Sequence, residues 1–195
     1  MSSLYMTMPK REEVMMIRIV GQRIAVLGLG VLSVLIVAGA AAAELKVGDP
    51  APPFSLQGSD GKTYSLEDFK GKSAVVLAWF PKAATKGCTK ECKSLRDNSK
   101  TLHELKVAYF TASVDKPEDN KKFADDLKVD YPILSDPDKT VAQAYGVISQ
   151  RGFANRWTFY IDKEGIIRTI DKAVNVEQAG PDVAAKIKEL GLETK

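Results

Sequence analysis

The two cysteines of the chain lie one after the other in "WFPKAATKGCTKECKSLRD", residues 79–97, as Cys88 and Cys92. Two cysteines are too few for a disulfide framework, and a structural zinc needs four ligands where the chain offers two cysteines and one histidine. A disulfide between them would close almost no loop and so stabilise the fold little. The pair is therefore either chemically reactive or a set of inert buried thiols.

The residues around Cys88 favour reactivity. The apolar run "SAVVLAWF", residues 73–80, has the length of a buried strand and ends at Pro81, and helical spacing follows from about Cys88 to Glu104. At the opening of a helix, free backbone N–H groups and the positive end of the dipole stabilise a thiolate. Thr85, three residues earlier, can present its hydroxyl to whatever the thiolate attacks. Pro81 fixes the backbone that enters the loop.

The motif around these residues resembles that of a known family. "PKAATKGC" matches Pro-x-x-x-Thr-x-x-Cys, the active-site signature of the peroxiredoxins. "GCTKEC" followed by "LRD", "YGV" at 145–147 and "RWTFYIDKEG" at 156–165 are similar to the branch typified by bacterioferritin-comigratory protein and the plant Q type. The resemblance covers essentially all of residues 44–195. It implies a thiol peroxidase that works without a metal, haem or flavin cofactor.

The resemblance also implies a role for each site residue. Cys88 would be the peroxidatic cysteine, Thr85 and Arg156 its activating partners, and Pro81 would complete the pocket. A thiolate that displaces one oxygen of a peroxide needs the leaving oxygen stabilised and both oxygens held in line. An arginine and a hydroxyl supply both. Oxidised Cys88 would become a sulfenic acid and condense with Cys92, and an external dithiol would then reduce the disulfide.

Cys92 departs from the pattern of the Q-type branch. In that branch the resolving cysteine often lies five residues after the peroxidatic one, whereas here the interval is four. Cys92 is thus one helical turn along, on the same face, with a Cα separation of about 6 Å. This separation is within the disulfide range, but the side-chain directions are poor unless the first turn unwinds. We expect Cys92 to resolve; the alternative is a one-cysteine enzyme reduced directly by an external thiol.

Two other functions are alternatives for a Cys-x-x-x-Cys pair on an exported thioredoxin-like fold. The Sco-type copper chaperones bind copper with two thiolates and a histidine from a distant loop, but the only histidine here is His103, which helical spacing does not align with the pair. Pro81 and Thr85 also have no role in copper binding. A membrane-tethered thiol-disulfide oxidoreductase usually carries Cys-x-x-Cys instead. The peroxidase hypothesis therefore explains more of the sequence.

The remaining elements predict an α/β protein with a thioredoxin-like fold: a central mixed sheet flanked by helices, with an N-terminal hairpin. Ser59, Asp60 and Gly61 supply the turn of that hairpin. The later elements are strands at 106–115 and 131–136, helices from 117 to about 127 and at 139–145, a hairpin of 156–162 with 165–171, and a closing helix at 181–190.

Residues 1–43 differ in kind from the rest. Basic residues precede the uncharged run "IAVLGLGVLSVLIVAGAAAA" at 24–43, which ends in small residues with an A-x-A pattern before Glu44. This layout predicts a secretory signal peptide cleaved after Ala43, or alternatively a retained membrane anchor formed by residues 24–43. Because the basic flank stays inside, either outcome would export the domain of residues 44–195. In a bacterium it would then be periplasmic or anchored at the periplasmic face of the membrane.

The charge of the chain bears on which binding partners are expected. The formal net charge is only +3, and no run of lysine or arginine interleaves with aromatic residues as a nucleic-acid groove requires. The sequence therefore argues against nucleic acid as a binding partner. The resemblance implies a peroxide substrate and an external dithiol reductant, either a thioredoxin-like protein or a small thiol. We expect a monomer or a weak dimer.

Overall fold

Seven strands form one mixed sheet in the computed structural model, which describes residues 44–193. The predicted export segment, 1–43, lies outside the described residues. The sheet order is β2-β1-β5-β4-β3-β6-β7, with β3 parallel to β4 and β4 parallel to β5 and the other neighbours antiparallel. The strands are β1 (Ser55–Gly58), β2 (Thr63–Ser65), β3 (Val75–Trp79), β4 (Ala108–Ser113), β5 (Ile133–Ser135), β6 (Thr158–Ile161) and β7 (Ile167–Asp171). The mixed sheet and the N-terminal hairpin of β1 with β2 are both confirmed.

The helices flank this sheet, as predicted, but one prediction was wrong. The helix expected from about 88 to 104 is two helices, divided at Asn98, whose side-chain amide donates to the carbonyl of Ser94 at 2.9 Å. Asparagine competes for backbone groups in this way and so favours helix ends. The helical elements are the 3-10 turn η1 (Leu66–Asp68), α1 (Lys86–Asp97), α2 (Ser99–Glu104), α3 (Pro117–Leu127), α4 (Thr140–Ala144) and α5 (Ala179–Glu189).

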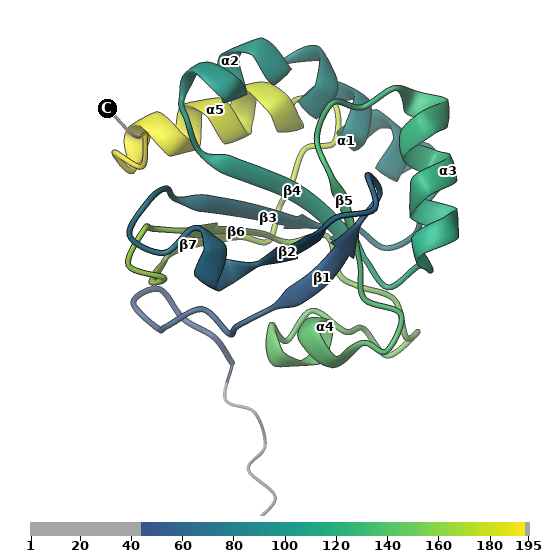
Figure 1. Ribbon diagram of the computed structural model, residues 1–195, viewed down its shortest axis with the longest axis horizontal. Helices are drawn as coiled ribbons and strands as arrows, with labels where there is room; N and C mark the ends of the chain where they lie inside the picture. Colours follow the sequence, from purple (N-terminus) through teal and green to yellow (C-terminus); the bar gives the residue numbers. More distant parts are fainter. Residues whose placement is uncertain (1–43, 194–195) are drawn as a thin grey trace, which may run out of the picture. The chain divides into compact units, whose positions relative to one another are not determined.

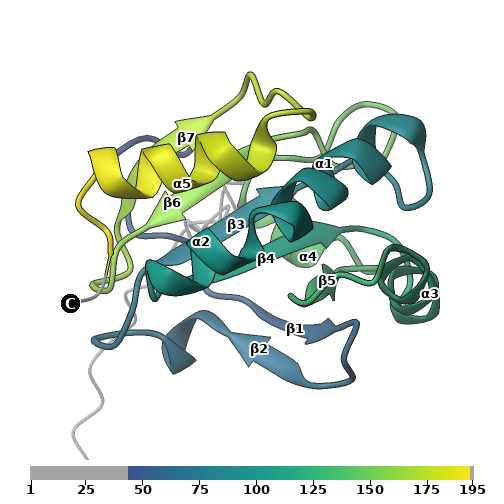
Figure 2. The same ribbon diagram turned by 90° about the horizontal axis from the view of Figure 1, so that it is seen from above.

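The helices cover both faces of the sheet unequally. Helices α1, α2, α3 and α5 pack with one face, where both cysteines belong to the buried cluster, whereas α4 and the segment before β1 cover the other face (Figures 1 and 2). All five residues of β3 are buried, and they alternate between the two clusters: Val76 lies on the cysteine side and Val75, Leu77 and Trp79 on the opposite side. A strand covered on both faces explains the continuous apolar run of residues 73–80.

The carboxyl end of β3 leads directly to α1. Phe80 is fully buried, Pro81 follows it, and five residues later α1 begins. Ligand and catalytic sites of open α/β sheets commonly form at the carboxyl ends of parallel strands, beside the helices that follow them. Within residues 44–193 no helix combines the length and the apolar character needed to cross a bilayer.

Candidate active site

Cys88 is the third residue of α1 and is fully buried, with no exposed surface. The first turn of an α-helix leaves backbone N–H groups without intrahelical partners, and the dipole adds positive potential there. The predicted placement of Cys88 at a helix start is therefore confirmed.

Arg156 reaches this sulfur from the other side of the site. Its Nη2 donates to Cys88 Sγ at 3.3 Å, although 68 residues separate the two along the chain. The arginine side chain is 21% exposed, so its guanidinium is partly removed from water. It lies two residues before β6, which is next to β3 in the sheet, and this pairing carries Arg156 to the end of β3 from which the Cys88 loop departs. The structure therefore brings these two predicted site residues into contact.

Glu91 completes the arrangement and was missed by the sequence analysis. Arg156 Nη1 donates to Glu91 Oε2, and the Glu91 side chain is only 1% exposed. The second carboxylate oxygen, Oε1, has no hydrogen-bond partner among residues 44–193. Glu91 follows Cys88 by three residues, so helical spacing places both on one face, and this was the signal available in the sequence. A buried carboxylate beside a reactive thiol needs a cation, which Arg156 supplies.

The loop between β3 and α1 holds the other two predicted site residues. Thr85 is the N-cap residue of α1, and its hydroxyl donates to the carbonyl of Lys82 at 3.1 Å. The hydroxyl therefore closes the loop on itself, and its role toward substrate stays a prediction. Pro81 is half-buried at the start of the loop. Ala84 has a φ of 58°, in the left-handed region that non-glycine residues seldom adopt, which makes this turn tight.

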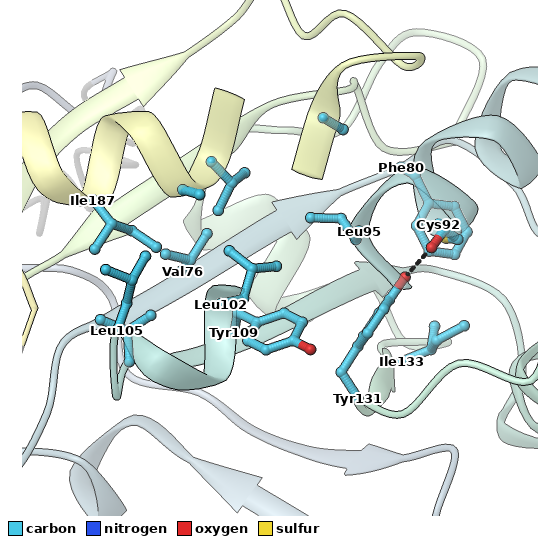
Figure 3. Packing of buried hydrophobic residues seen from close by; sticks show 14 of the residues in the cluster. Val76, Phe80, Cys92, Leu95, Leu102, Leu105, Tyr109, Tyr131, Ile133 and Ile187 are labelled. Atoms are coloured by element: carbon cyan, nitrogen blue, oxygen red, sulfur yellow. Dashed lines mark hydrogen bonds between the residues drawn. The ribbon is translucent and has the colours of Figure 1, made fainter. Parts of the chain in front are cut away.

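Cys92 lies one turn beyond Cys88, fully buried in the core beneath α1. Burial raises the pKa of its thiol to about 12. Both cysteines are free thiols in this structure. In the folded helix, Cys92 is thus a protonated core residue and belongs to the same buried cluster as Phe80, which is labelled with it in Figure 3.

Contacts from two other elements hold α1 in place over the sheet. The Tyr131 hydroxyl donates to the backbone carbonyl of Cys92 at 3.0 Å, drawn as the dashed line in Figure 3. At the next turn, Ser94 Oγ donates to the carbonyl of Glu177 at 3.2 Å and accepts from the backbone N–H of Gly180 at 3.0 Å. A Cβ at Gly180 would come within 2.3 Å of the Ser94 carbonyl oxygen, so glycine is what permits α5 to approach so closely.

Comparison with known proteins places the chain in a family. Residues 47–170 match the AhpC/TSA family. The chain belongs to the AhpC/TSA family. Peroxiredoxin Bcp of Escherichia coli K12 is 38% identical to it over 133 residues, which cover 65% of this chain and 85% of the relative. A putative peroxiredoxin bcp of Coxiella burnetii is 33% identical over 151 residues, covering 74% of this chain and 99% of the relative.

Solved structures agree with this assignment. Peroxidoxin BcpB from Mycobacterium tuberculosis is 30% identical with a TM-score of 0.68, and the match covers 75% of this chain and 98% of that protein. A PrxQ variant from Xylella fastidiosa has a TM-score of 0.70 at 21% identity over 76% of this chain and 99% of that one, a likeness of fold. Within the AhpC/TSA family the chain is therefore a peroxiredoxin of the bacterioferritin-comigratory and Q type, and a thiol peroxidase. The copper-chaperone and thiol-disulfide oxidoreductase alternatives are not favoured.

Proposed function

We propose that Cys88 reduces hydrogen peroxide or an organic hydroperoxide through a sulfenic acid. The sulfur of the thiolate attacks one peroxide oxygen, an S–O bond forms as the O–O bond breaks, and the leaving oxygen takes a proton to give water or an alcohol. The observation that carries this proposal is the contact of Arg156 Nη2 with Cys88 Sγ at the start of a helix.

Arg156 would act on two partners at once. Its guanidinium is planar and presents five N–H donors, so contacts with Cys88 and Glu91 leave donors for a bound peroxide. A donor held toward the leaving oxygen stabilises the charge that grows there as the O–O bond breaks. We assign Arg156 and Cys88 as catalytic residues, with Thr85 contacting the peroxide and Pro81 shaping the loop. Glu91 is a positioning residue, because it acts through the arginine.

Cys92 would then resolve the sulfenic acid. Its thiol sulfur displaces the hydroxyl of the Cys88 sulfenic acid, which leaves as water, and a Cys88–Cys92 disulfide forms. The structure has Cys92 buried beneath α1, so this step requires the first turns of α1 to open. Opening would also lower the pKa of Cys92 from about 12 toward its ordinary value, which increases the thiolate fraction. A thioredoxin-type dithiol then reduces the disulfide.

One observation favours a second candidate cycle. Cys92 is fully buried and its thiol stays protonated at neutral pH while α1 is folded, which also suits an inert core cysteine. In that case the Cys88 sulfenic acid would be reduced directly by an external thiol. The two cycles share the first chemical step and differ only in whether α1 opens.

The purified chain with dithiothreitol as reductant tests the proposal. Wild type should consume peroxide catalytically, and Cys88→Ser should consume none. Without dithiothreitol, Cys92→Ser should still consume one equivalent of peroxide and leave a sulfenic acid that a dimedone-type probe traps. Normal turnover by Cys92→Ser, together with no intrachain disulfide in the oxidised wild type, would select the one-cysteine cycle. Peroxide reduction that survives Cys88→Ser would reject the proposal altogether.

Export of the domain is proposed on the sequence of residues 1–43 alone. The basic flank, the uncharged run and the small residues before Glu44 support a cleaved signal peptide. N-terminal sequencing of the native protein should begin at Glu44. Recovery of the intact N-terminus from a membrane fraction would replace cleavage by an anchor, and recovery of the intact chain from the cytoplasm would reject export.

A further inference from the structure

A tight turn presents an arginine and a phenylalanine beside the site. The Ile148–Ala154 bridge brings the two arms of this turn together, and its tip is closed by hydrogen bonds from the N–H of Gly152 to the carbonyl of Ser149 and from the N–H of Ser149 to the carbonyl of Phe153, both 2.9 Å. Gly152 has a φ of +76°, which glycine adopts without strain. The turn is therefore fixed by its own backbone.

Phe153 is exposed at this turn and has a lysine over its ring. It is one of two large hydrophobic residues exposed among residues 44–193, and 39% of its surface is accessible. Lys82 Nζ lies 5.6 Å from the centre of its ring, and Lys139 Nζ would lie 3.3 Å from a Cβ at the neighbouring Gly152. Together with Arg151, these cations and Phe153 are called the cationic rim below.

The cations of the rim have no carboxylate partner. Neither Lys82, Lys139 nor Arg151 forms an ion pair within the part of the chain that the structure describes. The side of Lys82 toward α3 shares a hollow with Asp115, Asp119 and Asp126, so the rim cations outside this hollow are Lys139 and Arg151. Unpaired charge beside an exposed aromatic residue is available to a binding partner.

The rim adjoins the two segments that carry Cys88 and Arg156. Phe153 precedes Arg156 by three residues, and Lys82 precedes Thr85 by three, so the two segments that meet at the Cys88–Arg156 contact meet again at Lys82 and Phe153. Cys88 has no exposed surface. A protein that delivers a thiol to this site must therefore lie against both segments, and its contact area would include the rim.

We propose that the cationic rim docks the acidic surface around the dithiol of a reductant protein. This inference rests on the proposed function, in which two partner thiols become a disulfide as the Cys88–Cys92 disulfide returns to two thiols. Phe153 and Arg151 are residue types enriched at the energetic centres of interfaces. Lysine and arginine charges around such a centre raise the association rate with an acidic partner and lose this effect as salt screens them.

Reduction by two dithiols of different charge tests the docking surface in the full chain. The first is a thioredoxin of negative net charge, kept reduced by its reductase and NADPH, and the second is uncharged dithiothreitol. For the Lys139→Glu/Arg151→Glu variant, kcat/KM for the thioredoxin should fall by about tenfold or more at low salt, and its dependence on salt should flatten. Turnover with dithiothreitol should stay at the wild-type value.

A matched control separates local from overall charge. Lys100→Glu/Lys188→Glu makes the same change of charge at exposed positions on α2 and α5 and should keep the wild-type kcat/KM for thioredoxin. Equal rates for the rim variant and wild type, or an equal fall in the control, would overturn the docking surface. Loss of turnover with dithiothreitol in wild type would instead reject the proposed function, so the two failures are distinguishable.

Discussion

Arg156 contacts Cys88 and Glu91 through different nitrogens of one guanidinium: Nη2 donates to the sulfur at 3.3 Å and Nη1 to the carboxylate. Glu91 fixes the arginine from a position one helical turn away from Cys88 on the same helix. The sulfur and the carboxylate that contact this guanidinium are therefore carried by one helix, so a displacement of the whole of α1 moves both together.

Arg156→Lys tests whether the reaction needs the planar guanidinium with its several N–H donors. Lysine keeps the positive charge but offers a single ammonium, which cannot hold the sulfur, Glu91 and a peroxide oxygen in a fixed plane. We expect the second-order rate of Cys88 oxidation by hydrogen peroxide to fall by about 100-fold, the usual cost of losing a donor that faces developing charge. Stopped-flow measurement of the oxidation step checks this. A rate equal to that of wild type would remove Arg156 from the reaction.

Glu91→Gln tests positioning through Arg156. Glutamine keeps the shape of the side chain but removes the charge that holds the guanidinium, so peroxide oxidation should slow by about tenfold. A second variant distinguishes positioning from a general loss of structure: if Glu91 acts only through Arg156, adding Glu91→Gln to Arg156→Lys should slow the reaction little further. If the double variant instead slows by the product of the two single-variant factors, Glu91 acts independently of the arginine.

The sequence predicted those parts of the site that depend on local rules. An apolar run covered on both faces became β3, the helix start after Pro81 placed Cys88 at the head of α1, and Pro117 opened α3 where expected. Turn chemistry likewise predicted the β1–β2 hairpin. These features follow from periodicity and backbone restraints of neighbouring residues, which a single sequence displays directly.

Long-range partners of polar side chains were not predictable in the same way. The Glu91–Arg156 pair joins residues 65 apart, and although helical spacing places Glu91 on the face of Cys88, a charged residue type does not by itself indicate a buried side chain. The division at Asn98 was missed because the apolar spacing continues through it from Leu95 to Leu102, and both residues are buried. A side-chain amide hydrogen-bonded to the helix backbone ends the helix there without disturbing the apolar pattern.

The raised pKa of Cys92 predicts a stability that falls in alkali. The ordinary pKa is 9.0 and burial raises it to about 12 in the fold, so above pH 9 the unfolded chain loses this proton while the folded chain keeps it. The free energy of unfolding therefore falls by up to about 1.4 kcal/mol per pH unit because of this group, until the folded thiol ionises. Urea unfolding of the reduced protein between about pH 8.5 and 10 follows this loss. The buried tyrosines, whose ordinary pKa is 10.0, add to it near the upper end of this range, so a Cys92 variant is needed to isolate the thiol.

Cys92→Ala supplies the comparison for this pH dependence. The variant should be less stable than wild type at neutral pH because a buried side chain is shortened, but its stability should fall less steeply above pH 9. The difference between the two stabilities should therefore shrink as the pH rises. Curves that stay parallel across the range would show that the Cys92 thiol ionises as readily in the folded chain as in the unfolded one.

Tyr131→Phe tests whether the hydroxyl contact with α1 controls formation of the disulfide. The change removes the hydrogen bond to the Cys92 carbonyl and should cost about 1 kcal/mol of stability. If α1 must open before Cys92 reaches Cys88, the same loss lowers the cost of opening, and disulfide formation after peroxide addition should accelerate by about fivefold. Quenching with acid at timed intervals and mass spectrometry of the Cys88–Cys92 link measure this rate.

Tyr145→Phe is the matched control, because its hydroxyl donates to the carbonyl of Pro52 at 2.9 Å in the cluster on the opposite face of the sheet. It should lose similar stability without changing the rate of disulfide formation, since that contact does not hold α1. Equal acceleration in both variants would mean that the disulfide forms through global unfolding. No acceleration in Tyr131→Phe, despite the loss of stability, would mean that the contact with Tyr131 is still intact when the two sulfurs meet.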